Sequence, residues 1–232
     1  MEEGENFIRV AGLICEPSRA RILWNLLDGK AYTATELAVA ADISFSSASN
    51  HLSKLLKANI IKFETQGRHR YFSFLDSETA YAVEALATLA NTNSSGKVKK
   101  EKPRNGIRYC RTCYDHLAGF VGVKFAEAFE RKEFLHKTET AYEVTEKGWE
   151  WFAEFGIFQS DFAGNRRPLT RQCLDWSERR PHLAGQLGAT FLEKLFQKKW
   201  FKKVQFSREL IITSKGFQEI YQSLELDLRQ ST

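Results

Sequence analysis

The fold of the N-terminal part is decided by residues 35–74, which read TELAVAADISFSSASNHLSKLLKANIIKFETQGRHRYFSF. A short alanine-rich helix is predicted over 35–41, and the polar turn 42–44 separates it from a second helix. Apolar residues in this second helix recur at the spacing of a single helix face. They are Phe45, Ala48, Leu52, Leu55 and Leu56. This arrangement predicts a helix-turn-helix.

A β-hairpin is predicted directly after the second helix. Residues 60–65 and 69–74 are rich in β-branched and aromatic side chains, and Gly67 allows the tight turn between them. Further helices are predicted over 7–14, 17–27 and 77–90. A helix-turn-helix followed by a hairpin is a winged helix-turn-helix.

The outward face of the second helix carries small polar and basic side chains. A helix that enters the major groove of DNA needs small groups close to the bases and donors or acceptors for their edges. Asn50 suits an adenine edge, and lysines suit phosphates. The alternative is a face that is merely solvated. The DNA-contact candidates are Ser46, Ser47, Ser49, Asn50, Ser53, Lys54 and Lys57 on the helix, and Arg68, His69 and Arg70 at the hairpin.

Charge and composition divide the chain into three parts. The 232 residues carry a net charge of +5, and a basic protein favours nucleic-acid partners. A polar, basic linker is predicted at 93–106, between a domain at 1–92 and a second domain at 107–232. We expect a cytoplasmic protein without a membrane partner, because no apolar run approaches the roughly 20 residues of a membrane helix and the first residues do not resemble a signal peptide.

The second domain contains an internal repeat. HLAGFVGVKFAEAF at 116–129 aligns with HLAGQLGATFLEKL at 182–195, and 142–148 aligns with 210–216. Each copy is predicted to form helix, short strand and helix, and the two copies are expected to pack as one pseudo-symmetric, winged-helix-like domain. Its many aromatic residues are expected to form the core. The whole chain is therefore predicted to be mostly α with small β-wings, in the α+β class.

Residues 7–90 resemble the ArsR/SmtB family of bacterial winged-helix repressors. The resemblance lies in Pro17-Ser-Arg-Ala-Arg-Ile-Leu, Glu36-Leu-Ala-Val-Ala, Ser49-Asn-His-Leu-Ser-Lys-Leu-Leu and Gln66-Gly-Arg-His-Arg-Tyr-Phe-Ser. It implies a homodimer paired through the first and last helices of this domain, which binds an inverted repeat in double-stranded DNA and is released by an effector. It also places His51 on the reading face, where a hydrogen bond to phosphate or to neighbouring backbone is the alternative role.

The sequence departs from the metal-sensing members of that family. Ala38 and Ala40 stand where those members carry two cysteines, and alanine offers no ligand atom. The last helix of the domain has carboxylates but no histidine, whereas soft and borderline metals bind Cys or His. No metal site is predicted in 1–92, and the sequence predicts no bound cofactor.

Residues 107–232 resemble the C-terminal extension of a longer subset of these regulators, through the motifs at 112–119 and 173–185. The spacing Cys110-x2-Cys113-x2-His116 looks like a metal or redox cluster that shares one face if the segment is helical, and Cys173 and His182 are its counterparts in the second copy. Three readings stay open: zinc held by ligands such as Cys110, Cys113, His116 and Cys173, thiol oxidation with Cys113 as the most reactive thiol, or packing and capping. These five residues are the candidate effector or redox site.

Two other functions compete with a DNA-binding repressor. One is a thiol-dependent enzyme built on Cys113 and His116, with the winged domain as its regulator. The other is a winged domain that binds protein or RNA. The sequence lacks a Gly-rich phosphate loop, Gly-x-Ser-x-Gly and His-Glu-x-x-His, so no enzyme is predicted. We therefore predict a dimeric transcriptional repressor.

Overall fold

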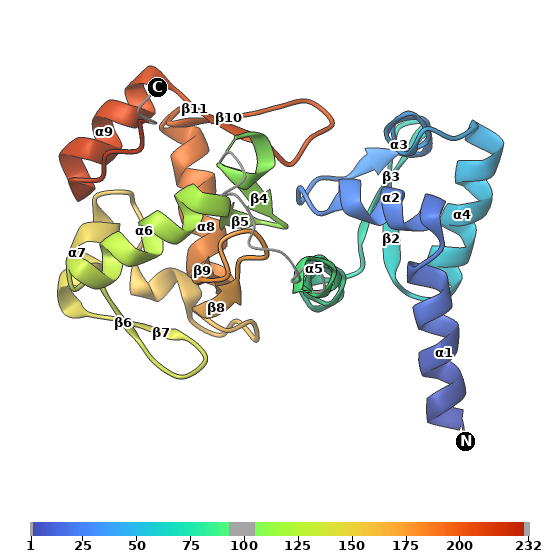
Figure 1. Ribbon diagram of the computed structural model, residues 1–232, viewed down its shortest axis with the longest axis horizontal. Coiled ribbons are helices and arrows are strands. Elements are labelled where there is room, and N and C mark those ends of the chain that lie inside the picture. The colour runs from blue at the N-terminus through green and yellow to red at the C-terminus, as the bar shows by residue number, and fades with distance from the viewer. Residues whose placement is uncertain (1, 93–104, 230–232) are drawn as a thin grey trace. The chain divides into compact units, whose positions relative to one another are not determined.

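Residues 2–92 and 105–229 are described by the structure, a computed structural model (Figure 1). The chain divides into two compact units, Met1–Ala87 and Thr88–Thr232. The predicted boundary at 92 stays a prediction, and most of the predicted linker lies outside the described residues. Each unit is treated by itself below.

The helices of the first unit begin at polar caps. Thr33 and Glu36 form a capping box at the start of α3, and Ser44 accepts the backbone N–H of Ser47 at the start of α4. Asp42, at φ 55°, ends α3 in the left-handed region, which makes the turn between the two helices tight. The helices are α1 (Glu2–Ile14), α2 (Pro17–Leu26), α3 (Ala34–Ala41), α4 (Phe45–Lys57) and α5 (Ser77–Thr92).

A three-stranded antiparallel sheet completes this unit. Its strands are β1 (Tyr32–Thr33), β2 (Ile61–Gln66) and β3 (His69–Phe74), in the order β1-β3-β2. Gly67, at φ 60°, lies in the turn between β2 and β3, as the sequence predicts. The predicted winged helix-turn-helix is therefore present.

The apolar face of α4 packs into the core of the first unit. Ala48, Leu52 and Leu55 are at most 1% exposed, and α4 packs against α3 and α2. Phe45 is 59% exposed, so its predicted place on the buried face is wrong. Phe45 is the first residue of α4, ahead of the residues that pack into the core of the unit.

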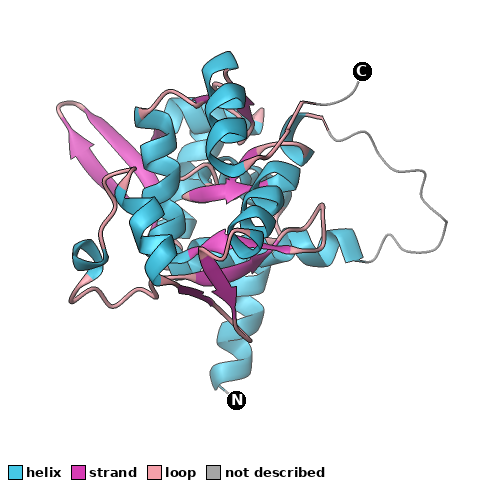
Figure 2. Ribbon diagram, turned by 90° about the vertical axis from the view of Figure 1, so that its left-hand side faces the viewer, coloured by secondary structure: helices cyan, strands magenta, loops and turns pink. Residues whose placement is uncertain are grey.

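The second unit contains two copies of one arrangement: hairpin, helix, hairpin, helix. The prediction of helix, short strand and helix missed the first hairpin of each copy. Figure 2 shows the strands as short pairs among the helices. The first copy has β4 (Arg111–Cys113), β5 (His116–Ala118), α6 (Gly119–Arg131), β6 (Leu135–Lys137), β7 (Tyr142–Val144) and α7 (Glu146–Ala153). The second has β8 (Arg171–Leu174), β9 (Pro181–Ala184), α8 (Gly185–Gln197), β10 (Phe201–Lys203), β11 (Leu210–Ile212) and α9 (Ser214–Leu224). Two short 3-10 helices, Gly106–Arg108 and Gln159–Phe162, lie outside these copies.

The two copies interlock around one aromatic core. Helix α6 packs on β9, and α8 packs on β5, so each helix covers the hairpin of the other copy. Phe125, Phe129 and Phe191 lie at the centre of the core, within 3% exposure, and their rings contact one another. The prediction that the aromatic residues form the core is confirmed.

Candidate nucleic-acid interface and cysteine–histidine cluster

Helix α4 presents the predicted polar face to solvent. Its first turn is fixed by the Ser44 cap, and its opposite face is buried, so the orientation of the helix about its axis is set. Ser47 and His51 are half-buried. The exposed members of the face are Ser46, Ser49, Asn50, Ser53, Lys54 and Lys57.

The hairpin of β2 and β3 forms the wing. All residues from 62 to 70 are exposed. The guanidinium carbon of Arg70 lies 4.8 Å from the ring centroid of Phe63, so this arginine is held along the strand by a cation–π contact. Arg68 and His69 directly follow Gly67 and are the basic groups at the tip.

His51 connects α4 to the start of α2. Its Nδ1 lies 3.3 Å from Arg19 Nη1 and 3.4 Å from Glu16 Oε2. Burial alone would raise the pKa of Glu16. Hydrogen bonds from the backbone N–H groups of Arg19 and Ser18 have the larger effect, so this pKa lies below its ordinary value. His51 thus orients α4 through neighbouring side chains, and a direct DNA contact by His51 stays a prediction.

Four of the five candidate effector residues lie together in the second unit. Hairpin β4–β5 pairs Cys113 with His116, and hairpin β8–β9 pairs Cys173 with His182. Their ligand atoms all lie within 4.8 Å of one another. The predicted helical face for 110–116 is wrong, because this segment forms a hairpin.

Cys110 is not a member of this cluster. Its side chain is fully buried, and burial raises the pKa of its thiol well above the ordinary range. Its predicted place among the zinc ligands is therefore wrong, and His182 completes the set instead. Cys113 is 1% exposed, whereas Cys173 is half-buried, so Cys173 is the more accessible thiol of the cluster. That Cys113 is the most reactive thiol stays a prediction.

A carboxylate lies behind each histidine of the cluster. His116 Nδ1 is 3.2 Å from Asp115 Oδ1, and His182 Nδ1 is 3.6 Å from Asp175 Oδ2. Burial lowers the pKa of His116, but the Cys113 sulfur and Asp115 outweigh it and raise this pKa to about 9.

An arginine accompanies each of these carboxylates. Arg167 contacts both oxygens of Asp115, at 2.6 and 3.1 Å. Arg111 Nη2 lies 2.7 Å from Asp175 Oδ2, and both side chains are fully buried. Burial raises the pKa of Asp175, but the Arg111 guanidinium and His182 outweigh it and hold this pKa well below its usual range. Both carboxylates are therefore ionised and paired.

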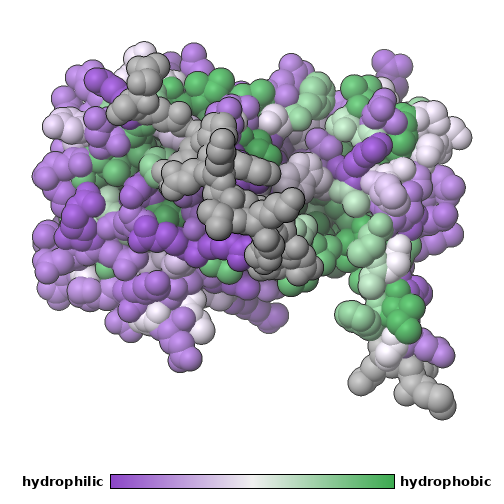
Figure 3. Space-filling view, in the orientation of Figure 1, coloured by the Kyte–Doolittle hydropathy of each residue, from purple (hydrophilic) through white to green (hydrophobic). Residues whose placement is uncertain are grey.

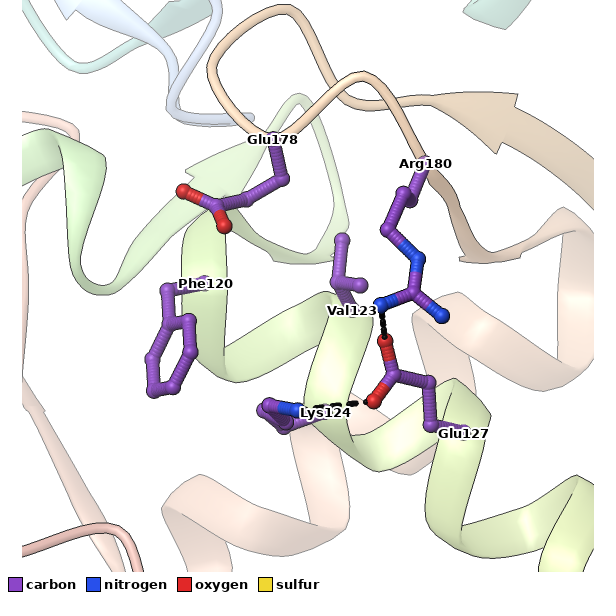
Figure 4. A pocket seen from close by; sticks show the side chains of 6 residues that line it. All are labelled: Phe120, Val123, Lys124, Glu127, Glu178 and Arg180. Carbon is purple, nitrogen blue, oxygen red and sulfur yellow. Dashed lines mark hydrogen bonds and ion pairs between the residues drawn. The ribbon is translucent and has the colours of Figure 1, made fainter. Parts of the chain in front are cut away.

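A separate surface pocket lies on α6. Glu127 is paired there with both neighbouring cations, at 2.9 Å to Lys124 Nζ and 2.5 Å to Arg180 Nη1 (Figure 4). Since each of these charges already has a partner, the pocket offers little for a charged ligand. Its lining consists of Phe120, Val123, Lys124, Glu127, Glu178 and Arg180.

The first unit thus defines a class of protein: a winged helix-turn-helix with an exposed polar helix and a basic wing. A helix-turn-helix domain model matches residues 15–62. The chain is 39% identical over 211 residues to the uncharacterized HTH-type transcriptional regulator YdfF of Bacillus subtilis, covering 91% of this chain and 93% of that protein. The chain therefore belongs to the family of HTH-type transcriptional regulators. It has a winged helix-turn-helix DNA-binding domain, as the resemblance to the ArsR/SmtB family predicts.

Two further proteins are similar to the N-terminal part. The HTH-type transcriptional regulator CmtR of Mycobacterium tuberculosis is 35% identical over 78 residues, which are 34% of this chain and 65% of CmtR. The solution structure of the homodimeric winged helix-turn-helix domain of Mb0332 from Mycobacterium bovis, a possible ArsR-family regulator, aligns with a TM-score of 0.37 and 18% identity. That alignment covers 41% of this chain and 88% of the domain. Among the described residues, no helix is long and apolar enough to cross a membrane.

Proposed function

We propose that this protein is a dimeric repressor that binds an inverted-repeat operator, with α4 in the major groove and the wing beside it. This proposal rests mainly on the contrast between the two faces of α4. Ala48, Leu52 and Leu55 are buried, while the opposite face exposes small polar side chains and lysines. Serines allow a close approach to the bases, and Asn50 is long enough to pair with an adenine edge.

The dimer is supported by apolar side chains that the first unit leaves exposed. On α1, Phe7 is 73% and Ile8 70% exposed, and Leu86, on the part of α5 that belongs to the first unit, is 39% exposed. Apolar residues of α1 reach the surface in Figure 3. Exposed apolar residues on these two helices favour burial against a second copy. A two-fold dimer presents two copies of α4, which suits an inverted repeat.

Release from DNA is assigned to the second unit. The proposed trigger is an effector or a modification of the thiols, at the candidate site that includes Cys113, His116, Cys173 and His182. These residues are brought together by two hairpins, as expected of a shared site. Double-stranded DNA is the proposed partner, in place of RNA or a protein. The relatives' names are those of transcription regulators, so a thiol-dependent enzyme has no support beyond the cluster itself.

The test is DNA binding measured by fluorescence anisotropy, with the intergenic DNA upstream of the gene as the specific site. We expect Asn50→Ala to weaken specific binding by about 1–3 kcal/mol and to leave binding to random DNA nearly unchanged. Asn165→Ala is the matched control, since Asn165 is an exposed asparagine of the second unit. Wild-type affinity in Asn50→Ala would show that α4 does not read the site. Equal binding to RNA of the same sequence would favour the RNA alternative.

A further inference from the structure

The cysteine–histidine cluster is built by equivalent residues of the two repeated copies. Each copy supplies one cysteine and one histidine from neighbouring strands of a hairpin. We propose that Cys113, His116, Cys173 and His182 form a closed, tetrahedral Zn²⁺ site that joins the two copies. This inference rests on the geometry of the second unit and is independent of DNA binding.

The distances between like atoms match those of a tetrahedral zinc site. Zn–S bonds of about 2.3 Å place two sulfurs about 3.8 Å apart, and Zn–N bonds of about 2.0–2.1 Å place two nitrogens about 3.3–3.4 Å apart. In the structure, the sulfurs of Cys113 and Cys173 are 3.7 Å apart, and the Nε2 atoms of His116 and His182 are 3.2 Å apart. A disulfide would hold the sulfurs at about 2.05 Å.

The orientation of the histidines also points to a cation between them. Each Nδ1 faces a carboxylate, Asp115 or Asp175, and a proton on Nδ1 leaves a lone pair on Nε2. The Nε2 atoms of His116 and His182 lie 3.2 Å apart and are directed at the same space. A metal ion in place of the proton that these two atoms can share would bind both of their lone pairs. A carboxylate behind a ligating histidine is the usual outer shell of a zinc site.

The charges in and around the cluster balance once Zn²⁺ is present. Two thiolates neutralise the ion, while Arg167 and Arg111 neutralise the carboxylates of Asp115 and Asp175. Balance matters here because an unpaired charge is costly in a buried site. His116 and His182 are fully buried and Cys113 is 1% exposed, so water can supply little of the compensation.

The donor set selects the ion and the kind of site. Two sulfurs and two imidazole nitrogens suit Zn²⁺, whereas Mg²⁺ and Ca²⁺ take oxygen ligands. Four protein ligands leave no open position, which is typical of a structural site and not of a catalytic one. Glycines let each helix start close to the hairpin of its own copy: a Cβ built on Gly122 would lie 2.5 Å from the Leu117 carbonyl oxygen, and one on Gly188 would lie 2.7 Å from that of Leu183.

The test is the metal content of the full-length protein, purified without an affinity tag under reducing conditions from zinc-supplemented cells. Elemental analysis should give one zinc per chain after gel filtration with a weak chelator. Cys173→Ser and His182→Gln should lose this zinc. The matched controls are Cys15→Ser and His136→Gln, since Cys15 and His136 are exposed and lie outside the cluster, and both should keep it.

A second measurement does not depend on the folding of any variant. Wild-type protein stripped of metal and titrated with Co²⁺ should show the visible bands of tetrahedral cobalt, with thiolate-to-metal charge transfer, saturating at one equivalent. Zn²⁺ should then abolish both signals. Either of two results would overturn the proposal: no stoichiometric metal with all thiols free, or a Cys113–Cys173 disulfide found by mass spectrometry in the protein as purified. Full zinc retention by both cluster variants would overturn it as well.

Discussion

Gly216 offers a sharp test of how helix α9 packs on the hairpin before it, within the second copy. It lies in the first turn of α9, where a Cβ would be 2.2 Å from the carbonyl oxygen of Trp200 and 3.0 Å from Ile212 Cγ2. A carbon normally approaches such an oxygen no closer than roughly 3.3 Å, so α9 must move away by about 1 Å. The same oxygen accepts the Thr213 N–H at 2.9 Å, and Gly216 N–H donates to the Thr213 hydroxyl at 2.9 Å. The movement therefore disturbs the start of the helix.

The expected effect of Gly216→Ala is a loss of stability of about 1–3 kcal/mol. Alanine is preferred to glycine inside a helix by up to about 1 kcal/mol, which favours the variant. Overpacking a rigid contact costs about 1–3 kcal/mol, and weakening the Thr213 hydrogen bond costs roughly 1 kcal/mol more. The steric cost therefore exceeds the gain from alanine's helix preference, so the variant is expected to be less stable than the wild type.

Thermal unfolding followed by tryptophan fluorescence measures this effect in the second unit. Trp149, Trp151, Trp176 and Trp200 all lie there, and the midpoint should fall by about 2–4 °C for each kcal/mol. Gly12→Ala is the control, because nothing lies within 4 Å of a Cβ at Gly12 of α1, and it should leave the midpoint unchanged or raise it. An unchanged or higher midpoint for Gly216→Ala would refute the steric argument.

Three further predictions follow from the charges of the two sites. Arg111→Met should destabilise the second unit by about 3–5 kcal/mol in urea unfolding, because it leaves the Asp175 carboxylate buried without its cation; adding Asp175→Asn should recover part of the loss. Asp115→Asn should lower zinc affinity about 10–100-fold at unchanged stoichiometry, in competition with a chromophoric chelator; unchanged affinity would exclude a supporting role. Lys57→Ala should weaken specific and random DNA binding alike and reduce the salt slope by about 1, whereas Lys215→Ala, in the other unit, should change neither.

The helix-turn-helix could be predicted because its signals are local. The apolar spacing of α4, its polar start and the Gly67 turn each act within a few residues, and all three point to the same structure. Phe45 is the exception. Its spacing fits the buried face, but burial also requires a neighbouring element beside the first turn of the helix, which the sequence of α4 does not encode.

The cluster could be predicted only in part, because its partners are joined by strand register and not by spacing along the chain. The CxxC spacing suggested Cys110, yet the β4–β5 register pairs Cys113 with His116. In the second copy, Cys173 and His182 are farther apart in sequence, but a longer loop between β8 and β9 accommodates the difference and keeps the same cross-strand pair. The sequence shows these two residues as counterparts of Cys113 and His116, but not that strand register brings each pair together.

The outer shells of the two histidines show what the cluster requires. Asp115 and Asp175 each stand two residues after the cysteine of their own hairpin, Cys113 or Cys173, and each faces the Nδ1 of the histidine in that hairpin. Their arginines, Arg167 and Arg111, are not equivalent in sequence, since Arg111 belongs to β4 and Arg167 precedes β8. A buried ion pair is often no more stabilising than apolar residues of the same volume, so stability alone does not account for Arg111 and Asp175. Orienting an imidazole does account for them, because the repeated carboxylate faces Nδ1 in both copies, at 3.2 Å and 3.6 Å, and leaves each Nε2 to a bound ion.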